Sequence, residues 1–172
     1  MPDKKQLIPN PDTSGVHLWL VLWKAAHMVE AHAHRNVAAQ GMGLSDFGVL
    51  EALLHKGPLR IKDLGAKVLL TSGSITTAID RLETKGLVER IGDKQDRRTR
   101  IVRLTATGRR AIQRAFAEHT QAMEQATSAL DRKDRAQLIV LLRRLGQDAE
   151  MQLTKDHKRV GAKRRQEEET WQ

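Results

Sequence analysis

The sequence predicts a mainly α-helical protein in which three short helices and two strands stand between longer helices. Three observations support this fold class. Hydrophobic residues make up 40% of the 172 residues but aromatic residues only 3%, which is typical of a helical core built from aliphatic side chains. Apolar residues recur at spacings of three and four in both outer parts of the chain. In the middle part, this spacing gives way to two short runs of strand-forming residues.

The two ends of the chain are expected to be flexible. Residues 1–15 contain three prolines and no hydrophobic periodicity, so they are predicted to form a loose arm. Residues 155–172 carry a basic run followed by an acidic run, with almost nothing to bury, and are predicted to form a charged tail. The folded part is therefore expected between residues 16 and 154.

The outer helices are predicted to pair with a second copy of the chain. Residues 16–43 contain a helix, over about residues 16–37, that is apolar on nearly every side, and such a helix is buried on every side. Residues 105–154 contain two amphipathic helices that begin after the N-cap residues Thr105 and Asp131. The apolar residues expected at the dimer interface are Leu18, Leu22, Leu138, Leu142 and Leu145.

Residues 44–104 form the central domain, which opens with two helices. Ser45 is predicted to cap the first helix, which ends at Gly57 and Pro58. The second helix covers about residues 61–68, and its start has no obvious side-chain cap.

The third helix of this domain divides into an apolar and a polar face. Thr71 or Ser72 is predicted to cap this helix, which runs to Lys85. Gly86 follows at the C′ position, where a left-handed backbone conformation is favoured. At 100° per residue, one face gathers the apolar side chains of Ile75, Ala78, Ile79 and Leu82. The opposite face includes Thr76, Thr77 and Arg81, and the N-terminal turns add Ser72 and Ser74. These five residues are the candidates for contact with nucleic acid. Short hydroxyl side chains let a helix approach base edges closely, although a solvated surface helix would carry the same residues.

Two strands, over residues 87–91 and 100–104, follow this helix and are joined by a charged, turn-rich loop. A hairpin of this kind after a helix-turn-helix makes a wing, so the sequence predicts a winged helix-turn-helix. The wing carries Arg97, Arg98 and Arg100, and arginine at a loop tip can enter the narrow minor groove or pair with phosphates. A solvated charged turn is the alternative interpretation.

Charge favours a polyanionic partner. The chain has 30 Lys and Arg against 21 Asp and Glu, a formal net charge of +9. Eleven basic and six acidic residues fall within residues 60–104, so more than half of the excess lies in the predicted winged domain. Nucleic acid and an acidic membrane surface are both partners of this kind, and charge alone does not choose between them.

Several other classes of function are excluded or disfavoured. The chain contains no cysteine, which excludes disulfides, thiolate metal sites and thiol redox sensing. No phosphate-binding glycine loop, no nucleophile with a paired base and no acid pair is present, so an enzyme and a bound cofactor are not expected. The longest apolar run is too short and too interrupted to span a bilayer, so we expect no membrane partner and a cytoplasmic protein.

Two sets of residues in the first helix leave alternatives open. Trp19, Trp23 and His27 lie along one side, where they could stack on an aromatic ligand or simply fill a core or an interface. His27, Glu30 and His34 share a face and could bind a transition metal, which would make the protein a metal-responsive regulator. Histidines share a face by chance in a chain with seven of them, and we do not assign a metal site.

The central domain resembles the MarR family of bacterial regulators. The resemblance is carried by the run from Leu69 to Gly108, and the outer helices match only in length and pattern. The segments that carry it are Leu69-Leu70-Thr71-Ser72-Gly73-Ser74-Ile75-Thr76, Ile79-Asp80-Arg81-Leu82-Glu83, Lys85-Gly86-Leu87-Val88-Glu89-Arg90, Asp96-Arg97-Arg98 and Val102-Arg103-Leu104-Thr105.

The resemblance implies a homodimer, held by its first and last helices, that binds a pseudo-palindromic operator as a repressor. It also implies release by a small aromatic or phenolic ligand. In the wing, it implies that Asp96 supports the tip and that Arg98 reaches the minor groove. Thiol-based peroxide sensing, found in some members, is not implied, because this chain lacks cysteine.

Two alternatives to a sequence-specific regulator remain at this point. An architectural DNA-binding protein would carry the same basic winged domain but show little sequence preference. A winged domain used for protein contacts would not bind DNA at physiological salt.

Overall fold

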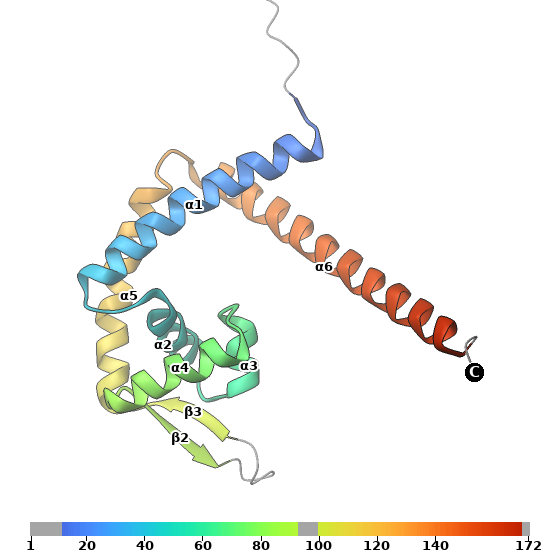
Figure 1. Cartoon of the computed structure of the whole chain (residues 1–172). Coiled ribbons are helices and arrows are strands. Elements are labelled where there is room, and N and C mark those ends of the chain that lie inside the picture. The colour runs from blue at the N-terminus through green and yellow to red at the C-terminus, as the bar shows by residue number, and fades with distance from the viewer. Residues whose placement is uncertain (1–11, 93–99, 170–172) are drawn as a thin grey trace, which may run out of the picture. The chain divides into compact units, whose positions relative to one another are not determined.

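The computed structural model describes residues 12–92 and 100–169, with residues 156–169 described by their backbone only. The chain divides into two compact units, one ending at Thr127 and the other beginning at Ser128 (Figure 1). The elements of the first unit are α1 (Gly15–Ala39), α2 (Leu44–Lys56), β1 (Leu59–Arg60), α3 (Ile61–Lys67), α4 (Ser72–Thr84), β2 (Val88–Gly92), β3 (Arg100–Leu104) and α5 (Ala106–Ala126). The second unit contains α6 (Arg132–Glu169). The predicted class, a mainly helical winged helix-turn-helix, is confirmed.

Side chains cap the three helices α4, α5 and α6 where the sequence predicts. The Thr71 hydroxyl accepts from the Ser74 N–H at 3.2 Å, and the Thr105 hydroxyl accepts from the Gly108 N–H at 3.0 Å. The Asp131 carboxylate accepts from the Asp134 N–H at 2.8 Å at the start of α6. These bonds satisfy N–H groups that have no partner within the helix.

The predicted cap at Ser45 is wrong. The N-cap residue of α2 is Gly43, and no side chain of the described residues caps this helix. The turn before it closes through Gly41, whose φ is 71°, and this tight turn brings the chain into the helix at Leu44. Ser45 thus lies inside the first turn, where the carboxylate of Asp46 supplies the favourable negative charge instead.

Three antiparallel strands form a small sheet in the order β1-β3-β2. The predicted pair is present as β2 and β3, with Val88 opposite Leu104. The third strand, β1, places Leu59 opposite Val102. Sequence analysis missed β1 because two residues are too few to show an alternating pattern.

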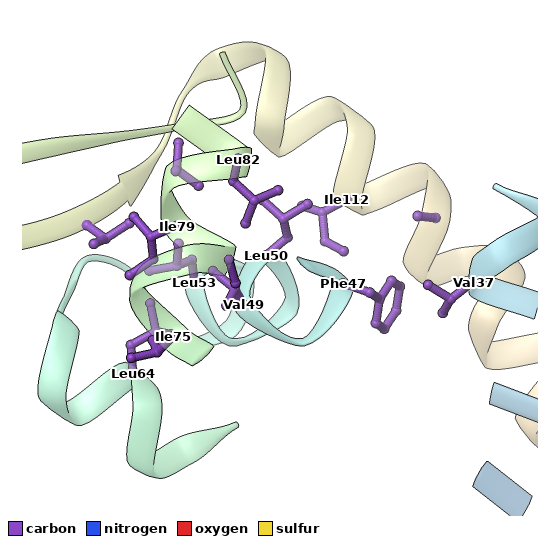
Figure 2. Close-up of a cluster of buried hydrophobic side chains, with 14 residues drawn as sticks. Val37, Phe47, Val49, Leu50, Leu53, Leu64, Ile75, Ile79, Leu82 and Ile112 are labelled. Carbon is purple, nitrogen blue, oxygen red and sulfur yellow. The ribbon is translucent and has the colours of Figure 1, made fainter. Parts of the chain in front are cut away.

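The core of the first unit lies between α2, α4 and α5 (Figure 2). The predicted apolar face of α4 is confirmed, since Ile75, Ala78, Ile79 and Leu82 are each at most 2% exposed. Burying an aliphatic side chain of this size contributes roughly 1.5–3 kcal/mol. This packing fixes the rotation of α4 about its axis and therefore decides which of its side chains face solvent.

A close approach of backbone holds the hairpin to α5. A Cβ at Gly108 would lie 1.8 Å from the carbonyl oxygen of Leu87, so only glycine fits at this point. The Thr105 hydroxyl donates to the Gly86 carbonyl at 2.7 Å. Gly86 itself has a φ of 67°, as predicted for the residue that ends α4.

The outer helices leave large apolar side chains exposed within a single chain. In α1, Val16 is 70% exposed and Trp19 60%, and Leu138 and Leu142 of α6 are 42% and 39% exposed. The all-round apolar α1 is thus not buried by its own chain, which is the condition that its pairing with a second copy requires.

The C-terminal helix is longer than predicted. The backbone of α6 continues to Glu169 rather than ending near residue 154, because residues 155–169 consist mainly of strong helix formers without proline.

Among the described helices, none is both long and apolar enough to cross a bilayer.

Candidate nucleic-acid interface

The exposed face of α4 carries the predicted short polar side chains. Ser72, Ser74, Thr76 and Thr77 are all exposed. The Thr76 hydroxyl donates to the Ser72 carbonyl at 2.9 Å, and the Thr77 hydroxyl donates to the Gly73 carbonyl at 3.0 Å. Because these protons are used within the helix, the two hydroxyl oxygens can offer a partner only acceptor lone pairs, with methyl groups beside them. This surface suits base edges that donate hydrogen bonds or present methyl groups.

Arg81 has a partner within the protein that sequence analysis did not predict. Its Nη2 lies 2.6 Å from Oδ1 of Asp46, and Nζ of Lys85 lies 3.7 Å from Oδ2 of the same carboxylate. Asp46 is only 2% exposed, whereas the Arg81 side chain is half-exposed. The hydrogen bond and the charge of Asp46 raise the pKa of Arg81 above its ordinary value. The ion pair ties α4 to the start of α2, and direct contact of Arg81 with DNA stays a prediction.

Arg90 joins the wing to α4, and sequence analysis missed this role as well. Its Nη2 lies 2.5 Å from Oδ1 of Asp80, its Nη1 pairs with Oε2 of Glu83, and its backbone N–H donates to Oε1 of Glu83 at 3.1 Å. Burial alone would lower the pKa of Arg90, but the bonds to Asp80 and Glu83 outweigh it and raise the pKa. A fork of two ion pairs between a strand and a helix holds the two elements in a fixed relation.

The base of the wing is described, and its tip is not. Arg100 is exposed at the start of β3, and Arg103 Nε lies 2.9 Å from Oε1 of Glu89 across the strand pair. The hairpin of β2 and β3 projects beside α4 (Figure 1). The predicted tip residues Asp96, Arg97 and Arg98 lie outside the described residues.

The predicted ligand contacts of α1 form a row of stacked rings. The ring centroids of Trp19 and Trp23 are 6.3 Å apart, and those of Trp23 and His27 are 6.4 Å apart. Trp19 and Trp23 are 60% and 58% exposed, so they do not fill a core of their own chain. Their role in an interface or in ligand binding stays a prediction.

A cavity of about 490 Å³ lies elsewhere, between α2, the end of α3 and α5. Its lining combines apolar side chains with basic ones and one acid, namely Leu44, Phe47, Gly48, Glu51, Ala52, His55, Lys56, Lys67, Val68 and His119. The rings of Phe47 and His119 lie 4.7 Å apart in a tilted arrangement. Trp19, Trp23 and His27 do not line this cavity.

The histidines of α1 do not assemble a metal site in the structure. Within residues 12–92 and 100–155, no three or more His, Asp or Glu side chains gather in a way that could hold a metal ion. The trio of His27, Glu30 and His34, which shares a helical face in the sequence, is therefore not supported as a ligand set.

A helix-turn-helix with an exposed polar recognition face and a basic hairpin beside it defines a winged-helix DNA-binding protein. The profile of the MarR family matches residues 44–99. The HTH-type transcriptional regulator MhqR of Bacillus subtilis is 32% identical over 132 residues, which cover 77% of this chain and 91% of MhqR. The chain belongs to the MarR family, and it is a DNA-binding transcriptional regulator.

Solved structures agree with this fold. Sco3205, a MarR family regulator from Streptomyces coelicolor solved in complex with DNA, matches with a TM-score of 0.71 and 25% identity, over 80% of this chain and 92% of that one. BpsR of Bordetella bronchiseptica, whose DNA binding is regulated by 6-hydroxynicotinic acid, matches with a TM-score of 0.69 and 22% identity, over 76% of this chain and 98% of that one.

Proposed function

We propose that this protein is a homodimeric repressor that recognises a pseudo-palindromic operator. The observation that carries the proposal is the division of α4 into a fully buried apolar face and an exposed face of short polar side chains, next to a basic hairpin. In a two-fold dimer, two such helices enter successive major grooves about 34–36 Å apart. Each half-site of the operator then meets one copy of α4.

The wing completes each half-site. Arg97 and Arg98, with Arg100 at the base of the strand, supply positive charge next to the duplex, and Asp96 supports the tip. An arginine that enters the minor groove reads its width and its negative potential, whereas the hydroxyl side chains of α4 read base edges in the major groove. The two elements therefore contribute specificity in different ways.

Dimerisation follows from the exposed apolar surfaces of α1 and α6. Leu18 and Leu22 of α1 and Leu138, Leu142 and Leu145 of α6 are the residues that we place in the interface. Leu22 is half-buried and the other four leucines are exposed within one chain. Such exposure is unfavourable in water, and a second copy is the partner that a two-fold operator requires.

A small aromatic or phenolic acid is proposed as the ligand that releases the DNA. The cavity between α2, α3 and α5 offers Phe47 for ring contact, with Lys56 and Lys67 to balance an anionic group. The regulation of BpsR by 6-hydroxynicotinic acid is an example of this chemistry on the same fold. The stacked Trp19 and Trp23 are the second candidate site for the ligand. The variants Lys67→Ala and Trp19→Ala distinguish this site from the cavity.

Selection of bound duplexes from random sequence, followed by fluorescence anisotropy at several salt concentrations, tests the proposed DNA recognition. We expect a two-fold symmetric site that binds at least 1,000-fold more tightly than random DNA, which is roughly the lower limit for specific binding proteins. Uniform binding to all sequences would instead identify an architectural protein. No binding near physiological salt would indicate a winged domain used for protein contacts.

The ligand is tested on the selected duplex with hydroxybenzoates as probes. Release of DNA should be weakened by Lys67→Ala if the cavity is the site, and by Trp19→Ala if the stacked rings are the site. Linkage requires that a ligand which lowers DNA affinity also binds less well to the DNA complex. If none of the hydroxybenzoates changes DNA affinity, control by this class of ligand is contradicted.

A further inference from the structure

Leu69, in the turn between α3 and α4, is unfavourable for the fold in two ways. Its φ is 55°, and among the described residues it is the one residue other than glycine with a positive φ. A side chain with a Cβ is disfavoured in this left-handed conformation, which glycine adopts without cost. Leu69 is also 91% exposed, the highest exposure among the large hydrophobic residues described. A glycine or an asparagine would suit the isolated protein better.

Gly73, four residues further on, is a glycine at a position where a residue with a side chain would be more favourable. It lies inside α4 with helical backbone. Apart from its chain neighbours and the nearby backbone of α4 itself, a Cβ built at this position would have no heavy atom of the described residues within 4 Å. Alanine would fit and would favour the helix more than glycine does. The contrast is Gly108, where the carbonyl of Leu87 leaves no room for a Cβ. The packing of the protein therefore does not require glycine at position 73.

Gly73 lies in the first turn of α4, and Leu69 lies in the turn just before this helix. Leucine occupies the position where glycine would be favourable, and glycine occupies the position where alanine would be favourable. The fold explains neither choice, whereas a partner that approaches the N-terminal end of α4 would explain both. Under the proposed function, that partner is the major groove of the operator.

We propose that Leu69 and Gly73 together read a thymine in each half-site. Without a side chain at position 73, the groove edge can come close to the backbone of α4. The C5 methyl of thymine is the apolar group that the major groove presents, and it is the natural contact for an exposed leucine side chain. This inference rests on the proposed function and adds to it the base that is recognised and the residues that recognise it.

The two variants Leu69→Gly and Gly73→Ala test the proposal, because each should improve the fold while it damages recognition. We expect the thermal midpoint of both variants to equal or exceed that of the wild type. Affinity for the selected operator should fall roughly five- to tenfold for each variant, as the loss of one base contact predicts. Binding to random DNA should not change.

Thr120→Ala is the matched control. Thr120 is exposed on α5, and its hydroxyl donates within the helix to the Phe116 carbonyl, as Thr76 and Thr77 do in α4. The substitution raises helix propensity at a site away from α4. It should leave operator affinity unchanged, which separates a general effect of helix stability from an effect at the interface.

Replacing each thymine of the operator by deoxyuridine, one symmetric pair at a time, removes only the methyl group. The wild type should lose affinity at one pair of positions, and Leu69→Gly should be insensitive to the replacement at that pair. The proposal is overturned if the wild type is insensitive at every position, if Leu69→Gly remains sensitive at the same pair, or if both variants bind the operator like the wild type. Failure to select any operator would overturn the proposed function and this inference with it.

Discussion

Asp46 shows how one buried residue can control the recognition surface. It lies in the first turn of α2 and accepts a hydrogen bond from Arg81, in the last turn of α4. It also faces Lys85, the residue that ends this helix. The negative charge favours the N-terminal end of α2 through the helix dipole and holds α4 through the ion pair. One carboxylate thus stabilises one helix and orients the other.

Asp46→Asn should lower the thermal midpoint and weaken operator binding. The substitution raises the net charge by one, so electrostatics alone would tighten binding to DNA. Weaker binding therefore indicates that Asp46 acts by orienting α4. Anisotropy titrations and thermal melts measure both effects.

Asp63→Asn is the control for this substitution, because Asp63 is exposed in the first turn of α3 and undergoes the same change of charge. It should leave the thermal midpoint nearly unchanged and bind DNA at least as tightly as the wild type. Tighter binding by Asp46→Asn as well would show that charge, and not the orientation of α4, decides affinity.

Residue roles that depend on neighbours in sequence were predictable, and those that depend on distant residues were not. The caps at Thr71, Thr105 and Asp131 and the left-handed Gly86 follow from positions a few residues apart. Asp46 and Arg81 are 35 positions apart. No local pattern distinguishes this pair from the other opposite charges of the chain, so only the fold could reveal it.

At the scale of elements, Arg90 makes α4 and the wing one rigid piece. The strand contributes the guanidinium and the helix contributes Asp80 and Glu83, and the Arg90 side chain is only 22% exposed. Arginine suits this place because its planar fork reaches two carboxylates at once, which lysine cannot do with the same geometry.

Arg90→Lys should reduce operator affinity although the net charge does not change. We expect a loss of about 1 kcal/mol in the free energy of unfolding, as for a partly exposed ion-pair network. Denaturant melts and anisotropy measure the two effects. Arg103→Lys is the control, because Arg103 and Glu89 form a well-exposed pair on the same hairpin. Equal effects of the two substitutions would contradict the special role of Arg90.

Gly108→Ala tests the close contact between α5 and the chain before β2. The added Cβ would meet the Leu87 carbonyl at 1.8 Å, so the backbone must move. The free energy of unfolding should fall by more than about 3 kcal/mol, which is a large effect for a single substitution. Gly146→Ala in α6, where a Cβ meets nothing within 4 Å, should be neutral or stabilising. A stable Gly108→Ala protein would show that α5 and Leu87 do not pack in this way.

The elements themselves were largely predictable, because three- and four-residue spacing and the caps are local signals. The helix boundaries within the winged domain agree with prediction to within a residue or two. The missed strand β1 is stabilised by pairing with β3, more than 40 positions away, and its own two residues carry no signal. The tail was expected to lack structure because it buries little, but helix propensity alone extends α6 through it.

At the scale of the whole molecule, the account depends on a second copy of the chain. The family and the winged domain explain DNA binding by one subunit, and the exposed apolar residues of α1 and α6 explain why two subunits would associate. The net charge follows directly from the sequence. The partner that packs against an exposed helix face does not, because the spacing of apolar residues predicts the face and not what covers it.

Leu142→Glu should disrupt the dimer. A carboxylate introduced into an apolar interface must be buried without a partner, which is strongly unfavourable. Light scattering should give a mass near 19.4 kDa for a soluble variant, and about twice this mass for the wild type. Val140→Glu, at a 63% exposed position of the same helix, is the comparison variant. A Leu142→Glu protein that remains dimeric and binds the operator would remove this residue from the interface.

Recognition of DNA by two copies of the chain is tested by the binding stoichiometry on two duplexes, the selected operator and the same operator with one half-site scrambled. Two chains per operator, with binding at least tenfold weaker on the scrambled duplex and a steep loss of affinity with salt, is the result that the structure leads us to expect. One chain per duplex, bound equally well to both, would contradict it.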